Sequence, residues 1–230
     1  THEIGYELIS PTLQIYLLHI DSYLEKEEIR LRMKDWPELQ RQSVLDYMQP
    51  KDYNATFFSK LLLQYAIAEN QLIFDWKQLA YSEKERPYFK NLEIDFNISH
   101  SGKYVALVIG NDRYGIDIEQ HRPVKIDLFN RQFTEDEWKV IRNSKDELKQ
   151  FFQFWAIKES AIKADGRGVE VLSKTQIISD NEVMVEGQKW HYQQFLHLDG
   201  YSFAVCSRLN QKFNVETIQT IASDIFLEKM

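Results

Sequence analysis

The sequence has few of the features that mark secreted, membrane-spanning or nucleic-acid-binding chains. Its single cysteine, Cys206, excludes an intrachain disulfide framework and indicates a reducing compartment, so we expect a cytoplasmic protein. The longest early apolar run, LQIYLLHI, is too short to cross a bilayer and follows no basic segment, so we expect neither a membrane association nor a signal peptide. The net charge is −7, and both halves are acidic, so we expect no nucleic-acid partner.

Common ligand-binding motifs are also missing. The chain has no Walker loop, no GxGxxG fingerprint and no Cys/His spacing of the kind that binds zinc. No linker rich in Pro, Gly or Ser divides the 230 residues, of which 43% are apolar, enough for a packed core. Any phosphate ligand would therefore be held by a metal and scattered basic groups.

Strand and helix signals alternate along the chain and predict an α+β fold. A first strand is expected at residues 13–20, and helical spacing of apolar residues marks residues 57–70 and 150–164. After each helix, the β-rich sequence ends alike, in SGKYVALVIG and in DGYSFAVCSR. This repeat predicts two similar, pseudo-symmetric halves, residues 1–110 and 111–230. Each would be a helix packed on a small antiparallel sheet, with a ligand site between them.

The segment YGIDIEQ places two acids close together. In a strand, Asp117 and Glu119 would share the face opposite Ile116 and Ile118. Two neighbouring like charges repel unless something neutralises them. A solvated strand tolerates this repulsion, so plain surface placement is an open alternative.

A second motif, FWAIKESAIKADGRG, places Glu159 and Lys163 on one helix face. An exposed ion pair is the ordinary interpretation, but the flanking Trp155 and Ile162 suggest a buried helix, where a carboxylate needs a partner. Together with the acids of YGIDIEQ, Glu159 would complete a set of three oxygen donors. Such donors suit Mg²⁺, with Mn²⁺ a possible substitute.

Upstream, FNISHSG and ERPYF hold a polar turn and a rigid basic turn. The hydroxyls of Ser99 and Ser101, the imidazole of His100 and backbone N–H groups suit a phosphate, although a satisfied turn is the more ordinary explanation. A Ser-His nucleophilic pair is disfavoured, because adjacent strand residues point to opposite faces.

The ordered set RPYF, FNISHSG, GIDIE and FWAIKESAIKADGRG, within residues 85–170, resembles the 4′-phosphopantetheinyl transferases of the surfactin-synthetase-activating type. The resemblance implies a monomer that binds coenzyme A and Mg²⁺ between its halves. It further implies transfer of the phosphopantetheine arm to a serine of an apo acyl or peptidyl carrier protein, with release of 3′,5′-ADP.

The resemblance also implies roles for individual residues. Asp117, Glu119 and Glu159 would hold the metal, and Lys163 would join Glu159 in catalysis at the pyrophosphate. Glu137, in FTEDEW, would be a second base, but Thr134 and Glu137 also match a helix capping box, which is the favoured interpretation. The residues implied to bind coenzyme A are Arg86, Pro87, Ser99, His100, Lys158 and Lys163.

Some expected basic residues are missing. The family often carries several in the WPELQRQSV region and an arginine in the next helix, for the 3′-phosphate. This chain has Leu39 and Gln42 at the apparent positions and YNATFF in place of the arginine. Candidate substitutes are Arg41, Lys51 and Lys60.

Two further functions stay open from the sequence, a non-catalytic module that binds coenzyme A or a carrier, and a Mg²⁺-dependent phosphoesterase. For carrier docking, the candidate surface is residues 124–138, where Phe129, Phe133 and Trp138 could equally be packed in a core.

Overall fold

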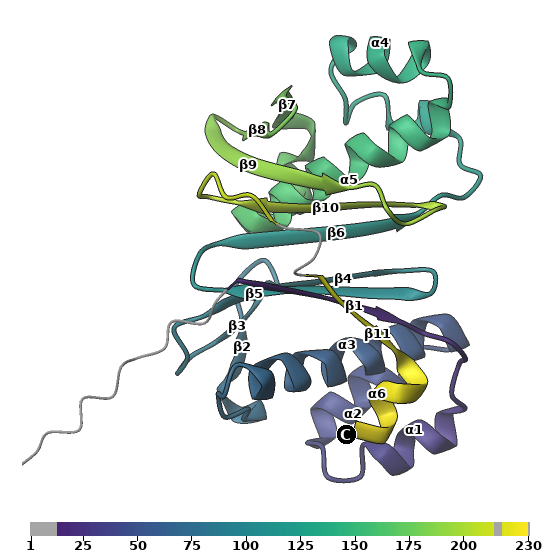
Figure 1. Ribbon diagram of the computed structural model, residues 1–230, viewed down its shortest axis with the longest axis vertical. Helices are drawn as coiled ribbons and strands as arrows, with labels where there is room; N and C mark the ends of the chain where they lie inside the picture. Colours follow the sequence, from purple (N-terminus) through teal and green to yellow (C-terminus); the bar gives the residue numbers. More distant parts are fainter. Residues whose placement is uncertain (1–12, 214–217, 230) are drawn as a thin grey trace, which may run out of the picture.

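The computed structural model describes residues 13–213 and 218–229, in which two β-sheets stack face to face between helices (Figure 1). The first sheet has the strand order β11-β1-β5-β4 and the second β6-β10-β9-β8-β7. The first sheet contains β1 (Gln14–His19), β4 (Asp95–Ser101), β5 (Tyr104–Gly110) and β11 (Ile218–Ala222). The second contains β6 (Tyr114–Gln120), β7 (Thr175–Ser179), β8 (Glu182–Val185), β9 (Gln188–Phe195) and β10 (Tyr201–Ser207).

The long helix α3 (Pro50–Glu69) covers the outer face of the first sheet. It begins with Pro50, whose fixed φ suits the first helical position, and its apolar side chains pack on Tyr16, Leu18 and Val105. The smaller elements of this layer are α1 (Lys26–Arg32), α2 (Glu38–Leu45), the 3₁₀ helix Trp76–Gln78, and the hairpin of β2 (Leu79–Tyr81) and β3 (Pro87–Phe89).

The second sheet is covered by α5 (Glu147–Asp165), whose apolar side packs on Trp190, Ala204 and Cys206. Before it lies α4 (Glu135–Asn143), which begins at the predicted capping box. Two 3₁₀ helices, Ile126–Phe129 and Val169–Lys174, flank this pair of helices in the sequence. Among the described residues, no helix has the length and apolar character needed to cross a membrane.

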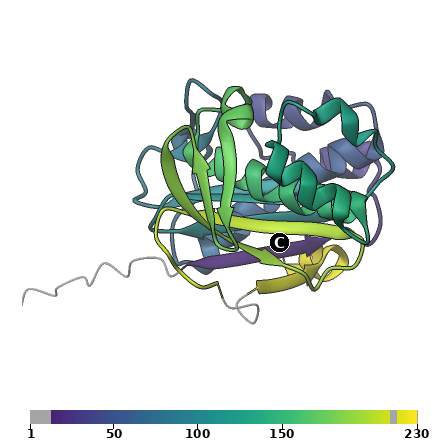
Figure 2. The ribbon, with the colours of Figure 1, turned by 90° about the horizontal axis from the view of Figure 1, so that it is seen from above.

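The inner faces of the two sheets pack against each other. Ile116 and Ile118 of β6 enter this central cluster with Ile15, Val108 and Val205. Seen from above, the strands of the two sheets lie over one another (Figure 2). Since side chains alternate along a strand, Asp117 and Glu119 face the other way, toward α5.

The predicted α+β fold with two related halves is confirmed, and both repeat segments lie where expected, at β5 and β10. The end of the chain differs from the prediction. β11 pairs in parallel with β1, so β11 belongs to the first sheet rather than to the C-terminal half, and α6 (Ser223–Lys229) packs on the core of the same layer through Phe226. The first sheet is therefore not purely antiparallel, as predicted, but contains one parallel pair. The spacing of residues along the sequence does not predict this pairing.

Candidate functional site

The acids of β6 approach α5 because of a glycine. A Cβ on Gly115 would lie 1.9 Å from the carbonyl oxygen of Ser160 and 2.4 Å from the nitrogen of Ala164, so no larger residue fits there. This close contact brings the next outward-facing residue, Asp117, to the last turns of α5. Sequence reasoning predicted the strand and the helix but not this contact.

Lys163 and Asp117 form the centre of the site. The Nζ of Lys163 lies 2.5 Å from Asp117 Oδ1 and donates a second hydrogen bond to the hydroxyl of Ser99 at 3.1 Å. Ser99 in turn donates to Asp117 Oδ1 at 2.9 Å. Asp117 is only 3% exposed, so the alternative of a solvated surface acid is wrong.

The second oxygen of Asp117, Oδ2, is buried and has no hydrogen-bond partner in the described structure. A buried carboxylate oxygen without a partner is energetically unfavourable unless a ligand satisfies it. This atom is therefore the strongest local sign that the site binds a cation.

The acids around Lys163 shift one another's protonation. Burial and the charge of Asp117 raise the pKa of Glu119, and the same two causes raise the pKa of Glu159 to about 7. Burial alone would lower the pKa of Lys163, but Asp117, Glu159 and Glu119 outweigh it and raise that pKa. The single positive charge of Lys163 therefore does not balance the negative charge of the three neighbouring carboxylates.

The three predicted metal ligands, Asp117, Glu119 and Glu159, offer the oxygen atoms that a hard cation prefers, but they do not surround a common point. In the described parts of the chain, no three His, Cys, Asp or Glu side chains lie close enough to enclose a metal. Oxygen donors alone, an orphaned Asp117 Oδ2 and mutually raised acid pKa values nevertheless fit Mg²⁺, which keeps waters and shares ligands with phosphates. The metal-ligand roles of Asp117, Glu119 and Glu159 stay predictions.

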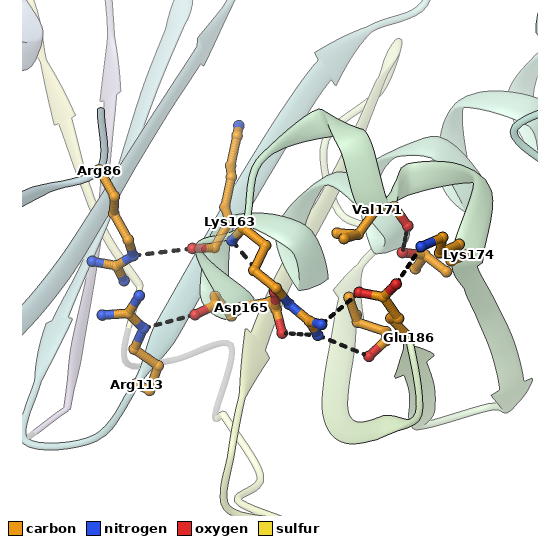
Figure 3. Close-up of polar contacts among 11 residues, drawn as sticks. Arg86, Arg113, Lys163, Asp165, Val171, Lys174 and Glu186 are labelled. Atoms are coloured by element: carbon orange, nitrogen blue, oxygen red, sulfur yellow. Dashed lines mark hydrogen bonds and ion pairs between the residues drawn. The ribbon is translucent and has the colours of Figure 1, made fainter. Parts of the chain in front are cut away.

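Two arginines of the preceding segments hold the C-terminal end of α5 (Figure 3). Arg86 donates from Nε to the carbonyl oxygen of Lys163 at 3.0 Å, and Arg113 donates to that of Ala164 at 2.7 Å. These carbonyls have no partner within the helix, so guanidinium groups satisfy them and complement the negative helix end. Arg86 also forms a bidentate pair with Asp95, at 2.9 and 2.7 Å. Its predicted role at the coenzyme A nucleotide must compete with these bonds.

A pocket of about 230 Å³ lies between this helix end and β3–β4. We call it the interface pocket. Glu159 and Lys163 line it from α5, and Arg86 and Pro87 line it from the other side. The structure thus brings four of the predicted site residues to one cavity between the halves.

A second pocket, of about 450 Å³, adjoins the first through Glu85, Pro87 and Ile98, which line both. We call it the aromatic pocket, after Tyr47, Trp76 and Tyr81 in its wall. Its remaining lining residues are Thr56, Ser59, Lys60, Leu63, Leu79, Phe96 and His100. Ser99 and His100 therefore face different sites, as strand alternation predicts. The Ser99 hydroxyl donates to Asp117, and its contact with a ligand phosphate stays a prediction.

Lys60 is the lysine that lines the aromatic pocket. Its Nζ lies 2.5 Å from Gln40 Oε1 and 5.6 Å from the Trp76 ring centroid, and no carboxylate pairs with it in the described structure. Of the three candidate substitutes for the missing basic residues, it is the one that lines a pocket, whereas Arg41 pairs with Glu38 and Lys51 is exposed.

Two predicted site residues, Glu137 and Lys158, lie away from both pockets and pair with each other at 2.7 Å. Lys158 has no exposed surface and donates to the carbonyl oxygen of Gln132, so the predicted contact with coenzyme A does not fit the structure. Glu137 closes the capping box with Thr134 and accepts from the backbone N–H of Ile177 at 2.9 Å. Its carboxylate is fully used by structural partners, which favours the cap over the base.

The aromatic residues proposed for carrier docking pack in one cluster, in which Phe133 is buried and Phe129 and Trp138 are partly buried. Phe129, Phe133 and Trp138 contact Phe151, and Phe129 and Phe133 also contact Trp155. Core packing therefore explains Phe133, whereas Phe129 and Trp138 keep some exposed surface, so docking through them stays a prediction. Leu128 of the same segment is 76% exposed.

Sequence reasoning missed several residues of the site. Asn97 lines the interface pocket, and Glu85 stands between the two pockets with a positive φ of 61°. For Ser101, the sequence predicted a polar turn but not its bond to Glu119, at 3.3 Å. The position of Ser101 two residues after Ser99 on one strand was the available signal, because such residues share a face.

Two family models match adjoining parts of the chain. One, described as the 4′-phosphopantetheinyl transferase superfamily, matches residues 113–206, and another, described as the N-terminal part of 4′-phosphopantetheinyl transferase, matches residues 24–111. Among individual proteins, the chain is similar to the 4′-phosphopantetheinyl transferase Sfp of Bacillus subtilis (strain 168), with 28% identity over 207 residues. That alignment covers 85% of this chain and 92% of the relative.

Two other relatives extend the comparison. The 4′-phosphopantetheinyl transferase gsp of Aneurinibacillus migulanus is 23% identical over 211 residues, covering 88% of this chain and 89% of its own. The L-aminoadipate-semialdehyde dehydrogenase-phosphopantetheinyl transferase of Xenopus laevis is 33% identical over 153 residues, covering 56% of this chain and 49% of its own.

Proposed function

The chain belongs to the 4′-phosphopantetheinyl transferase superfamily and is an enzyme of this transferase class. On this premise, we propose that it transfers the 4′-phosphopantetheine arm of coenzyme A to a serine of an apo carrier protein and releases 3′,5′-ADP. The observation that carries the proposal is a pair of adjoining pockets: the interface pocket between the halves, with Lys163 and Glu159, and the aromatic pocket of the N-terminal half, with Lys60.

The two pockets suit the two ends of coenzyme A. An adenine base packs well between aromatic rings, and the unpaired cation of Lys60 suits a nucleotide phosphate, with Pro87 shaping the passage between the pockets. The pyrophosphate would then lie in the interface pocket, where Lys163 offers positive charge from α5.

The reaction is a displacement at phosphorus. A bond forms between the serine oxygen and the phosphorus of the phosphopantetheine arm, the bond from that phosphorus to the ADP oxygen breaks, and the hydroxyl proton leaves. Such chemistry depends mainly on positioning and on neutralising charge. When bound, Mg²⁺ would supply charge neutralisation at the pyrophosphate, with Asp117, Glu119 and Glu159 as its protein ligands.

The protein's own residues supply the rest. Lys163 lies where it can stabilise the charge that grows on the leaving ADP oxygen. Glu159 lines the same pocket and is the acid best placed to accept the serine proton. Glu137 has no such role in this proposal, because its carboxylate serves the capping box and Lys158.

One assay tests the function. The protein is mixed with coenzyme A, Mg²⁺ and an apo carrier domain, and the carrier is weighed by mass spectrometry. A gain of one phosphopantetheine arm supports the transferase. Free 3′,5′-ADP without a change in the carrier would indicate a phosphoesterase instead, and neither product would indicate a binding module.

A further inference from the structure

β4 and β6 lie side by side although they belong to different sheets. Each is an edge strand, β4 of the first sheet and β6 of the second. An edge strand leaves a row of backbone N–H groups without partners, and buried N–H groups must find acceptors. The β6 strand is buried from Tyr114 to Ile118, so these groups cannot all turn to water.

Side chains of β4 supply the missing acceptors. The N–H groups of Tyr114 and Ile116 donate to Asp95 and Asn97 at 2.8 and 2.9 Å. The next two outward N–H groups, of Ile118 and Gln120, donate to the hydroxyls of Ser99 and Ser101 at 3.3 and 3.0 Å. Acceptor and donor are 19 residues apart in the sequence at every step. The result is a regular ladder in which side chains of one strand take the place of a backbone partner.

The two serines of this ladder also hold the two acids. Ser99 accepts from the Ile118 N–H and donates to Asp117 at 2.9 Å. In the same way, the Ser101 hydroxyl accepts from the Gln120 N–H and donates to Glu119 Oε2 at 3.3 Å, an oxygen that the exposed Arg122 also contacts at 3.5 Å. A hydroxyl offers one donor and two acceptor sites, so one serine can make both bonds.

The hairpin that carries Ser101 is itself fixed to the second sheet. Gly102 has a φ of +56°, and a Cβ there would lie 2.4 Å from the Tyr201 hydroxyl and 2.6 Å from Gln120 Oε1. The next residue, Lys103, donates its N–H to the Tyr201 hydroxyl at 3.1 Å. The end of β4 is thus held against β6 and β10, which leaves Ser101 little freedom to move away from Glu119.

We propose that Ser101 is a positioning residue for the phosphopantetheinyl transfer reaction. Its hydroxyl sets the direction of the Glu119 carboxylate, as that of Ser99 does for Asp117, while both fix the register between the two sheets. The value of this positioning to catalysis rests on the proposed function, in which the acids hold a cation. The ladder itself does not depend on that function.

The test compares Ser101→Ala with Ser101→Thr, which keeps a hydroxyl, and with Ser22→Ala, an exposed serine in the loop after β1. Amide exchange is followed by NMR, and Mn²⁺ binding by electron paramagnetic resonance with coenzyme A present. For Ser101→Ala we expect exchange at the Gln120 amide to rise about 10-fold, because its acceptor is lost. We also expect the Mn²⁺ dissociation constant to rise about 5-fold or more. In Ser101→Thr, the Gln120 exchange rate and the Mn²⁺ dissociation constant should stay near those of wild type. Ser22→Ala should change neither quantity.

Unchanged Gln120 exchange in Ser101→Ala would overturn the proposal, as would a weakened Mn²⁺ affinity that Ser101→Thr fails to restore. If wild-type protein binds no Mn²⁺ with coenzyme A, the cation assignment of the proposed function fails. The positioning role of Ser101 then fails with it, and the exchange rates of Gln120 in the alanine and threonine variants test the ladder alone.

Discussion

The Nζ of Lys163 contacts Asp117 through one carboxylate oxygen, Oδ1 at 2.5 Å, and leaves the other, Oδ2, buried without a partner. The lysine side chain is 29% exposed and the aspartate side chain only 4%. The lysine therefore reaches from the pocket surface to a buried acid, and the Oδ2 atom of that acid stays available to a further ligand. This arrangement gives the pair a structural role and supports the proposed role of Asp117 in binding a cation.

Asp117→Asn separates these roles. The amide cannot neutralise Lys163, so we expect the free energy of unfolding to fall by about 1–3 kcal/mol, as for other broken buried polar pairs. We expect the transfer rate to fall about 10²-fold or more, because a charged ligand oxygen is lost. Urea unfolding and carrier mass spectrometry measure the two effects.

The matched control is Asp117→Asn combined with Lys163→Met. Removing the unpaired cation should recover part of the lost stability, while the rate stays low. A single Asp117→Asn variant with wild-type stability and rate would contradict both roles.

Much of the site could be predicted because its parts are local sequence patterns. The alternation of Ile116, Asp117 and Ile118 predicted a strand with an acid on the face away from the sheet core, and the i,i+4 spacing predicted that Glu159 and Lys163 share a helix face. The capping box of Thr134 and Glu137 is confirmed for the same reason, since both of its bonds lie within four residues.

The rest depends on contacts between distant segments. Lys158 follows Ile157 in a helix whose buried side could not be placed without knowing that α4 packs beside it, so its pair with Glu137 was not foreseen. The ladder to β6 requires the relative register of two strands, which the spacing within each strand does not contain. The return of β11 to the first sheet likewise depends on tertiary packing.

The second prediction concerns the metal. We expect transfer with Mg²⁺ or Mn²⁺ and no turnover in excess EDTA, because all the acids of the site are oxygen donors and Asp117 Oδ2 has no other partner. Added Mg²⁺ should restore the rate after chelation. Full turnover in EDTA, with the carrier gaining its arm, would show that Lys163 neutralises the pyrophosphate alone.

The third prediction concerns Lys60 and pH. Burial lowers the pKa of Lys60 to about 8, so the side chain is charged below that pH and loses its charge above it. If it binds the 3′-phosphate, kcat/KM for coenzyme A relative to 3′-dephospho-coenzyme A should fall as the pH rises through about 8. The ratio of the two substrates cancels groups that act equally on both, and the 3′-phosphate itself titrates at about 6, below this step. Lys60→Gln should remove this pH step and lower the ratio at pH 7 about 10-fold.

His100→Ala is the control for that experiment. The imidazole of His100 is exposed at the aromatic pocket, yet desolvation by the surrounding protein, together with the charge of Lys163, lowers its pKa. The imidazole is therefore neutral at pH 7 and offers a hydrogen bond without charge. His100→Ala should weaken the binding of coenzyme A more than the binding of 3′-dephospho-coenzyme A. The fall of the kcat/KM ratio near pH 8 should remain in this variant. A step that persists in Lys60→Gln would assign it to another group.

Stability gives a separate check on Lys60. Its pKa falls from 10.5 when unfolded to about 8 when folded, so between these values the unfolded chain holds the extra proton. The contribution of Lys60 to the free energy of unfolding should therefore increase as the pH rises from 8 toward 10.5. In Lys60→Gln that gain should be absent, which urea unfolding at pH 7 and 9.5 can measure.

The last prediction separates Glu137 from Glu159, the two acids considered for the serine proton. Glu137→Gln keeps a capping hydrogen bond but leaves the fully buried Lys158 without a counter-charge, so we expect a loss of about 3 kcal/mol in stability with a normal rate for the folded enzyme. Glu159→Gln should lower the rate about 10²-fold, because proton transfer and ligand charge are both lost, with stability maintained or raised.

The double variant Glu137→Gln, Lys158→Met makes this contrast decisive. Methionine fills the buried space without a charge, so stability should return toward that of wild type while the rate stays normal. Rates are measured at saturating coenzyme A and Mg²⁺, below the unfolding temperature of every variant. A rate loss of about 10²-fold in the re-stabilised double variant would mean that Glu137 takes part in proton transfer, despite its three structural partners, since the lost stability could no longer explain it.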